Sequence, residues 1–273
     1  FGLYVASYGV IALRWRLLVG ETRGGLPKTI AVASVHNLYN QLFPARLGEF
    51  SILLLAKRYL GVSADVSGSS LVLARAMDFL AMGLAGLVLL GLVPGILERE
   101  PGLGLLVGGL CVVRVAGILA MLAAGENMAK SIAPAREEAG LLARGRRRLA
   151  RVAGLLGEPR SAGFYGKLMG WSLLLVTVRM LMFAVLVATG TETSVVLAGG
   201  MVIGLCTLLA GSSPVMGLLN TGTFEGGWVL GAVLVGVDAE AALVSAVAAH
   251  LVFICFQVLL GAGGQWWLST IRR

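Results

Sequence analysis

Charged residues are scarce in this chain, and that scarcity limits what it can be. Only 13% of its 273 residues are charged, whereas 58% are hydrophobic and the mean hydropathy is +0.89. An ordinary soluble domain carries about twice that charged fraction. The composition therefore excludes an ordinary soluble enzyme and favours a chain that lies largely within a membrane.

Residues that build soluble catalytic and metal sites are also few. The chain has three cysteines and two histidines. Cys111, Cys206 and Cys255 lie at unrelated spacings inside apolar stretches, so we interpret them as small buried hydrophobic residues rather than as a metal site or a disulfide. No nucleophile–base pair, phosphate-binding loop or metal cluster stands out in the sequence. We therefore expect a protein that is not an enzyme and needs no cofactor.

Long apolar runs dominate the sequence instead. A transmembrane helix needs about 20 predominantly apolar residues. Five runs of about this length cover residues 1–19, 70–90, 103–124, 166–188 and 239–260. The sequence therefore predicts an all-α polytopic membrane protein. Because the first run opens at Phe1 with no cleavable signal pattern, we also expect a further segment upstream.

Two further apolar regions, 30–60 and 195–235, are each interrupted by helix-breaking residues. The breaks fall at Pro44, Gly48, Pro214 and Gly222. A helical piece such as 30–43 reaches only about 21 Å, short of a hydrocarbon core of about 30 Å. We therefore predict two re-entrant hairpins of broken helices. Two tilted, kinked spans are the alternative for each region.

Basic residues cluster in one hydrophilic linker, 126–165. No aromatic residues are interleaved with its arginines between 126 and 160, which argues against nucleic-acid binding. Cytoplasmic loops carry an excess of lysine and arginine, and basic segments bind anionic lipid headgroups. We predict that this linker is cytoplasmic, that it lies on the headgroups as an amphipathic helix, and that the protein spans the plasma membrane.

Two stretches of the chain share a pattern. In each, a glutamate is followed by an apolar stretch, then Gly-Val-x-Ala, and then a basic or titratable residue fourteen positions after that glycine. The first stretch runs from Glu49 to Arg75 and the second from Glu225 to His250. Three complete crossings separate the starts of the two units. The sequence therefore predicts an inverted repeat, with residues 1–125 as its first unit and 166–273 as its second.

Ionisable residues within the apolar segments are the candidate site. Each charge at membrane depth costs about 3 kcal/mol on insertion scales, so such residues normally pair or face a polar cavity. We predict that headgroup binding and translocation use Arg46, Glu49, Arg75, Asp78 and Glu225. Arginine suits phosphate oxygens, which favours a headgroup clamp. The alternatives are a pair between Arg46 and Glu49 that only holds the turn, and a tie between helices at Arg75.

The sequence leaves the roles of four other ionisable residues open. Arg114 and Arg179 lie singly inside apolar spans, and either could pair with Glu225. His36 and His250 could carry protons, or could simply form hydrogen bonds in packed helix interfaces.

Several motifs together resemble one known family, the lysylphosphatidylglycerol synthase/flippase family, in its membrane region. The motifs are RWR at 14–16, HNLYN at 36–40, FPARLGE at 43–49, LARAMD at 73–78 and GSSPVMGLLNTGTFE ending at Glu225. The resemblance covers nearly the whole chain, although His250 stands where many members have arginine. It implies a flippase-like module that moves aminoacylated phospholipid between leaflets and that lacks the soluble synthase domain.

The function predicted from the sequence is therefore that of a lipid flippase or transporter. Its expected partner is an anionic or aminoacylated phospholipid, with a lipid-modifying synthase or a second copy of the chain as further partners, and no nucleic acid. Two alternatives remain. One is a membrane-embedded enzyme that acts on a lipid headgroup with Glu49 or Glu225 as acid or base. The other is a scaffold for a synthase or glycosyltransferase.

Overall fold

A computed structural model describes residues 1–93, 96–132, 154, 160–190, 197–213 and 217–271. Most of the basic linker, including its predicted amphipathic helix, and Pro214 lie outside these residues. Every regular element within them is helical.

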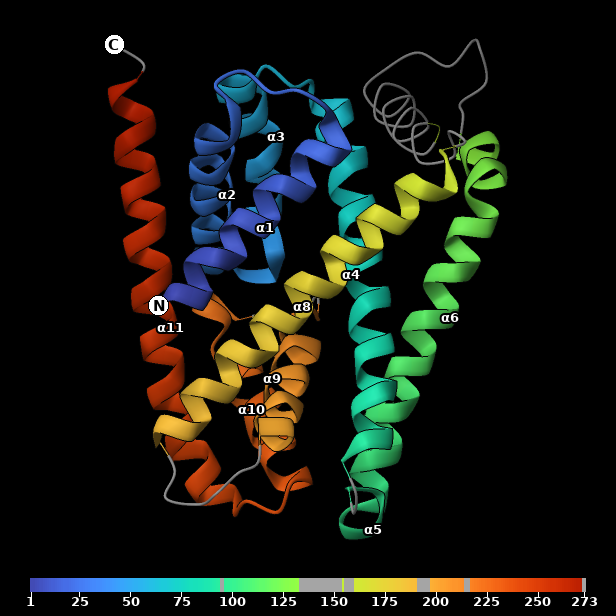
Figure 1. The fold of residues 1–273 in the computed structure, drawn as a ribbon, viewed down its shortest axis with the longest axis vertical. Helices are drawn as coiled ribbons and strands as arrows, with labels where there is room; N and C mark the ends of the chain where they lie inside the picture. Colours follow the sequence, from blue (N-terminus) through green and yellow to red (C-terminus); the bar gives the residue numbers. More distant parts are fainter. Residues whose placement is uncertain (94–95, 133–153, 155–159, 191–196, 214–216, 272–273) are drawn as a thin grey trace.

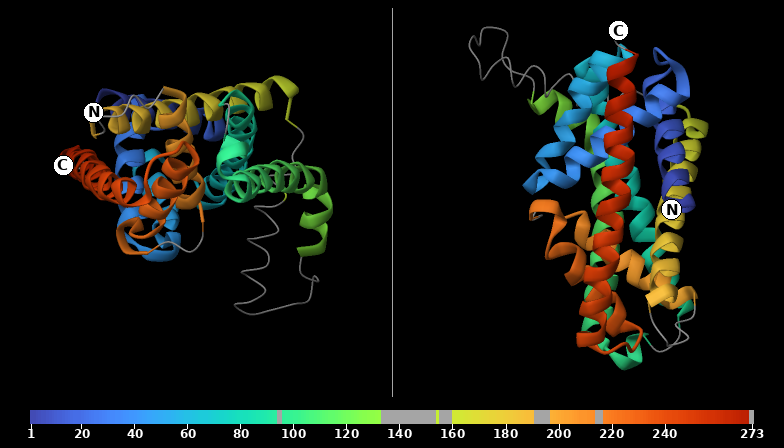
Figure 2. Two further views of the ribbon diagram at one scale, coloured as in Figure 1. Left: turned by 90° about the horizontal axis from the view of Figure 1, so that it is seen from below. Right: turned by 90° about the vertical axis from the view of Figure 1, so that its left-hand side faces the viewer.

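Five of the described helices are long and apolar enough to cross a membrane. They are α1 (Gly2–Val19), α4 (Ala64–Leu92), α6 (Pro101–Ile132), α8 (Ala162–Gly190) and α11 (Ala239–Thr270). This confirms the prediction of an all-α polytopic membrane protein. Although α1 is one of the five, it lies obliquely, with the first residue at mid-height of the molecule (Figures 1 and 2).

Polar side chains cap the first turns of two of the long helices. The Ser63 hydroxyl accepts a hydrogen bond from the Val66 amide at 3.3 Å, so α4 begins ahead of its apolar run. The Asp238 carboxylate accepts from the amides of Glu240 and Ala241, at 3.0 and 3.1 Å, and starts α11 in the same way.

Shorter helices fill the space between the long ones. They are α2 (Gly25–Leu42), η1 (Pro44–Phe50), α3 (Ser51–Leu55), η2 (Ala56–Leu60), α5 (Ile96–Arg99), α9 (Leu197–Gly211), η3 (Leu218–Asn220) and α10 (Thr223–Leu234). Figure 1 shows α2 and α3 in the upper half of the molecule and α9 and α10 in the lower half. The break between α2 and α3 and the break between α9 and α10 therefore lie near mid-height.

Both breaks contain non-glycine residues in the left-handed region of backbone conformation. Ala45 and Arg46 have φ of 51° and 57°, and Leu219 and Asn220 have φ of 56° and 63°. Such conformations cost roughly 1–2 kcal/mol per residue and persist only where the surroundings hold them. Each break is thus maintained by its tertiary contacts.

Close packing around α9 positions the lower half of the structure. A Cβ on Gly204 would lie 3.2 Å from the Met180 backbone, and one on Gly227 would lie 2.8 Å from the Thr207 Cα. Small residues therefore let α8 and α10 approach α9 closely, as is common between membrane helices. Cys206 of α9 is buried in this packing.

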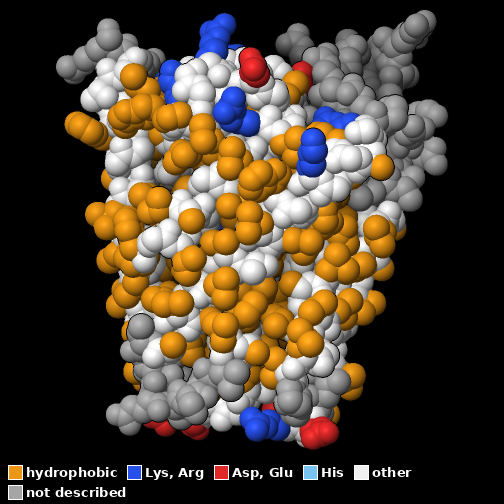
Figure 3. All heavy atoms as spheres, viewed as in Figure 1, with side chains coloured by type: hydrophobic (Ala, Val, Ile, Leu, Met, Phe, Trp, Pro, Cys, Tyr) orange, Lys and Arg blue, Asp and Glu red, His pale blue; other side chains and the backbone are white. Residues whose placement is uncertain are grey.

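The outer surface is apolar over the middle of the molecule. Figure 3 shows hydrophobic side chains across the centre of the visible face and most of the visible lysine and arginine side chains at its upper end. Helices α6 and α11 lie on opposite flanks of α9 and α10 (Figures 1 and 2) and carry many of the exposed apolar side chains. Cys111 is buried as predicted, but Cys255 of α11 is exposed, so that prediction is wrong for Cys255. On a membrane helix, a small apolar residue can face outwards as well as into the core.

Candidate functional site

The two helix breaks contact one another directly. The Gln41 side-chain amide of α2 donates to the Leu219 carbonyl of η3 at 2.6 Å. From η1, the Arg46 guanidinium donates to the carbonyls of Gly211 and Ser213. The last carbonyls of a helix lack intrahelical partners and form its negative end, so Arg46 caps the C-terminus of α9. Side chains beside the break after α2 thus bond to backbone carbonyls that lack helical partners at the break between α9 and α10.

A chain of ion pairs runs from this contact into the long helices. Glu49 lies 2.5 Å from Arg46 and 3.0 Å from Arg75. The Arg75 guanidinium also lies 3.6 Å from the Asp78 carboxylate. The structure therefore brings together four of the five predicted site residues. They come from η1 and α4, two elements that are separate in the sequence.

Arg14 of α1 extends the network and was not among the predicted site residues. Both of its terminal nitrogens donate to the two carboxylate oxygens of Asp78, and one of them also donates to the Ser172 hydroxyl of α8 at 3.1 Å. Arg14 and Asp78 are buried, and a bidentate pair of this kind is strong. The network consequently ties α1, α4 and α8 together.

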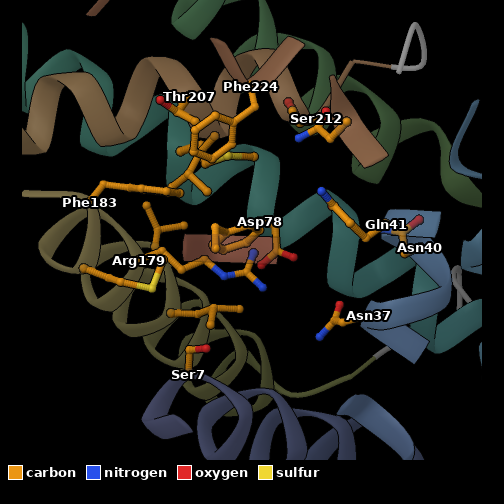
Figure 4. Close-up of a pocket in the computed structure, with 18 of the residues that line it drawn as sticks. Ser7, Asn37, Asn40, Gln41, Asp78, Arg179, Phe183, Thr207, Ser212 and Phe224 are labelled. Atoms are coloured by element: carbon orange, nitrogen blue, oxygen red, sulfur yellow. The ribbon is translucent and has the colours of Figure 1, made fainter. Parts of the chain in front are cut away.

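A cavity of about 140 Å³ adjoins the ion pairs. Its polar lining includes Arg46 and five residues labelled in Figure 4, namely Ser7, Asn37, Gln41, Asp78 and Arg179. These residues come from five different helices, and Arg179 points towards Asp78 in the figure. A polar space of this size holds several water molecules or a small polar group.

Polar residues of α2 are the part of the lining that the sequence analysis missed. Asn37, Asn40 and Gln41 all line the cavity. Their spacings of three and four residues put them on one helical face within an otherwise apolar segment, a signal that was available in the sequence.

Arg179 of α8 also lines the cavity, and it does not form the suggested pair with Glu225. Among the residues that the structure describes, no carboxylate lies within 4.0 Å of its guanidinium. Arg114, the other lone arginine, donates to the Leu209 carbonyl at 3.1 Å and lies over the Phe79 ring, so it does not pair with Glu225 either.

The site carries a surplus of positive charge. Four arginines, at positions 14, 46, 75 and 179, face two carboxylates, those of Glu49 and Asp78. The described side chains therefore leave two positive charges without a matching carboxylate. Buried charge of one sign is unfavourable without a counter-charge, and guanidinium groups bind phosphate and carboxylate groups well.

Glu225, the fifth predicted residue, lies apart from this network. Its Oε2 accepts a hydrogen bond from the Gly222 amide at 2.7 Å and caps the start of α10, where Gly222 has a φ of 84°. Its Oε1 lies 2.6 Å from His250 Nδ1. Among the described residues, Glu225 is linked to α2 only indirectly, through His250, Leu219 and Gln41.

These features define a polytopic α-helical membrane protein with a polar, positively charged site buried between broken helices. Within that class, the chain belongs to the family described as lysylphosphatidylglycerol synthase TM region, whose family model matches residues 1–261. The match spans every residue of the site and confirms the family inferred from the motifs. It relates the chain to proteins of lipid metabolism. No curated protein and no solved structure matches the chain.

Proposed function

We propose that this protein is a lipid flippase or transporter that moves an anionic phospholipid or its aminoacyl ester between the leaflets of the plasma membrane. The observation that carries the proposal is the cavity where the two helix breaks meet, lined by arginines that outnumber the carboxylates around them. A phosphate group entering this cavity supplies the missing negative charge.

Arg179 is the central residue of the proposed headgroup site. Its guanidinium lines the cavity and has no carboxylate within ion-pair distance among the described residues. Glu49 and Asp78 hold the neighbouring arginines in fixed positions. A phosphate bound at Arg179 would therefore meet preorganised donors, and the acyl chains would stay in the surrounding lipid.

We further propose that the segments from α2 to η2 and from α9 to α10 are re-entrant hairpins that enter from opposite faces, as in an inverted repeat. Two observations support this. Each segment consists of short helices, and each occupies one half of the molecule (Figure 1). In transporters built from inverted repeats, broken helices of this kind meet at the substrate site.

The charges at the two ends support a cytoplasmic location for the linker. Lys57 and Arg58 are exposed at the end of η2, whereas Glu98, Asp238 and Glu240 are exposed near α5 and the start of α11. Lysine and arginine accumulate in cytoplasmic loops. We therefore assign the end that bears the linker to the cytoplasm.

A role in transport is favoured over enzymatic acid–base chemistry by the state of the carboxylates. Glu49 bridges two arginines and Asp78 accepts from Arg14 and lies beside Arg75, so the oxygens of both carboxylates are already engaged by guanidinium groups. A general acid must give its proton to the substrate, and a general base must have an oxygen free to take one from it. We accordingly propose that the chain is not itself an enzyme. We also propose that a synthase or a second copy of the chain is its protein partner.

Reconstitution tests the proposal. Purified protein in liposomes is given phosphatidylglycerol, its lysyl ester or phosphatidylcholine, each with a fluorescent acyl chain, and a membrane-impermeant quencher reports the leaflet. We expect the anionic lipid or its aminoacyl ester to equilibrate faster than in empty liposomes, and Arg179→Gln to lose most of this acceleration.

Arg114→Gln is the matched control, because Arg114 also lies inside a span but contacts Leu209 and Phe79 rather than the cavity. It should keep the wild-type rate if it elutes as folded protein. Wild-type rates in Arg179→Gln, or no acceleration of any of the three lipids by the wild-type protein, would overturn the proposed function.

A further inference from the structure

The imidazole of His250 lies in a buried contact that the proposed headgroup site does not use. Only 4% of its side chain is exposed, and its ring stacks on Phe224 with centroids 4.2 Å apart and planes 9° apart. Its Nδ1 lies 2.6 Å from Glu225 Oε1, and its Nε2 lies 3.0 Å from the Leu219 carbonyl oxygen. Both ring nitrogens therefore face oxygen atoms.

This arrangement fixes how many protons the contact holds. A backbone carbonyl only accepts, and it lies closer to Nε2, at 3.0 Å, than the amide nitrogen of Gln41, at 3.5 Å, so we assign the hydrogen on Nε2 to the bond with Leu219. A neutral imidazole has one N–H, which leaves Nδ1 with a lone pair. The 2.6 Å contact with a carboxylate then requires one more proton between Nδ1 and Oε1. His250 and Glu225 together thus hold one proton beyond a neutral imidazole and a carboxylate.

The surroundings of Glu225 favour placing that proton on the imidazole. The carboxylate lies in the first turn of α10 and accepts from the Gly222 amide, and the N-terminus of a helix stabilises negative charge there. The pair is then an imidazolium and a carboxylate that share a short hydrogen bond.

The described groups that face His250 from other elements leave Glu225 as its titratable partner. From α2 comes the uncharged Gln41, whose amide nitrogen lies 3.5 Å from Nε2, and from η3 comes the Leu219 carbonyl. Arg46 of η1 reaches the same break at Gly211 and Ser213 and pairs with Glu49. On α8, Arg179 points towards Asp78 (Figure 4).

The carboxylates of Asp238 and Glu240 lie at the far N-terminal end of the helix that carries His250. Ten residues along a helix correspond to about 15 Å, which puts Glu240 well outside contact distance. The proton count is therefore a property of the Glu225–His250 pair.

Loss of the shared proton would break a contact that holds two helices together. The contact joins the start of α10 to α11, and the Leu219 carbonyl at its other side also holds Gln41 of α2. Leu219 and Asn220 are in left-handed conformations that depend on such contacts. Without the proton, only one ring nitrogen carries a hydrogen, so the lone pair of the other faces either the Glu225 carboxylate or the Leu219 carbonyl, and attraction becomes repulsion at that contact. Gln41 lies 3.5 Å from Nε2 and Phe224 stacks on the ring, and both line the cavity, so the cavity adjoins the pair.

We propose that Glu225 and His250 form a proton-binding site that latches the tip of the α9–α10 segment to α11, and that release of the proton to water in the cavity frees this tip. Proton binding does not depend on any lipid. Coupling of lipid movement to a proton gradient would follow from it, and this consequence alone rests on the proposed function.

Nitrogen NMR of the full chain in lipid nanodiscs tests the site. With ¹⁵N-histidine labelling, the His36→Gln and His250→Gln variants assign the two signals, because the chain has only two histidines. We expect both ring nitrogens of His250 to carry or share hydrogen at acidic pH, and one of them to lose it as the pH rises. A neutral ring with a single N–H throughout the pH range of the folded protein would overturn the proposal.

Amide hydrogen exchange tests the latch. We expect exchange over residues 217–226 to accelerate over the same pH range, beyond the ordinary effect of pH seen elsewhere in the chain. Glu225→Gln should abolish this extra step, whereas Glu240→Gln, which removes an exposed carboxylate from the start of α11, should retain it. The proposal would also be overturned if Glu225→Gln kept the additional acceleration of exchange, or if the wild-type protein lacked it. None of these readouts measures lipid movement, so they can fail while the flippase proposal stands, and the reverse.

Discussion

The carboxylate of Glu49 lies between two guanidinium groups, Arg46 at 2.5 Å and Arg75 at 3.0 Å. Glu49→Gln keeps the size of the side chain and removes its charge. The surplus of positive charge in the site then rises from two to three. Removing one partner of a buried ion pair costs about 3–5 kcal/mol. Because the glutamine oxygen still accepts one hydrogen bond and 16% of the native side chain is exposed, we expect the lower end, about 3 kcal/mol.

Two measurements on Glu49→Gln separate stability from function. Thermal unfolding in lipid nanodiscs should show a lower midpoint than wild type, with the protein still folded at room temperature. The leaflet assay described above should show that lipid movement is largely lost, because Arg46 and Arg75 lose the common partner that holds them in place.

The double variant Glu49→Gln/Arg75→Gln decides between a functional and a purely structural network. It returns the charge surplus to two, so most of the lost stability should return. Lipid movement should stay low, because the clamp has lost an arginine. If the double variant regained both stability and transport, the ion pairs would only hold the fold and the assignment of these residues to the headgroup site would be refuted. Wild-type transport in the single variant would refute it as well.

Two further predictions concern the turn and the orientation. Gly48→Ala should lower the free energy of unfolding by up to about 3 kcal/mol in a denaturant titration, since the new Cβ would clash with backbone atoms of Tyr39 and Asn40, which cannot rotate away. The control is Gly9→Ala, whose Cβ would meet nothing within 4 Å and which should be neutral or slightly stabilising. Equal effects of the two substitutions on stability would contradict this explanation. In a cysteine-free background, a cysteine at position 145 should react with an impermeant thiol reagent only after the cells are opened, whereas one at position 98 should react in intact cells; external labelling at 145 would reverse the proposed orientation.

Local sequence features were enough to predict where the helices break. Pro44 follows α2 because proline has no amide hydrogen to continue the ladder. Gly222 directly precedes α10 with a φ of 84°, a conformation that glycine adopts without steric cost. The apolar runs likewise predicted five helices of spanning length, because burial in lipid demands about 20 apolar residues in succession whatever the helices pack against.

The partners of the charged residues were decided only by the tertiary structure. The sequence left these partners open: Asp78 could pair with Arg75 or reach the segment at 30–60, and Arg114 or Arg179 could pair with Glu225. In the structure, Asp78 also binds Arg14, 64 positions away in the sequence, and Glu225 binds His250. Because an unpaired charge within a membrane is costly, each of these charged residues needs a partner. Which partner it finds depends on how the helices cross. That is set by packing between segments far apart in the sequence, such as α2 and α11, which no local pattern of residues encodes.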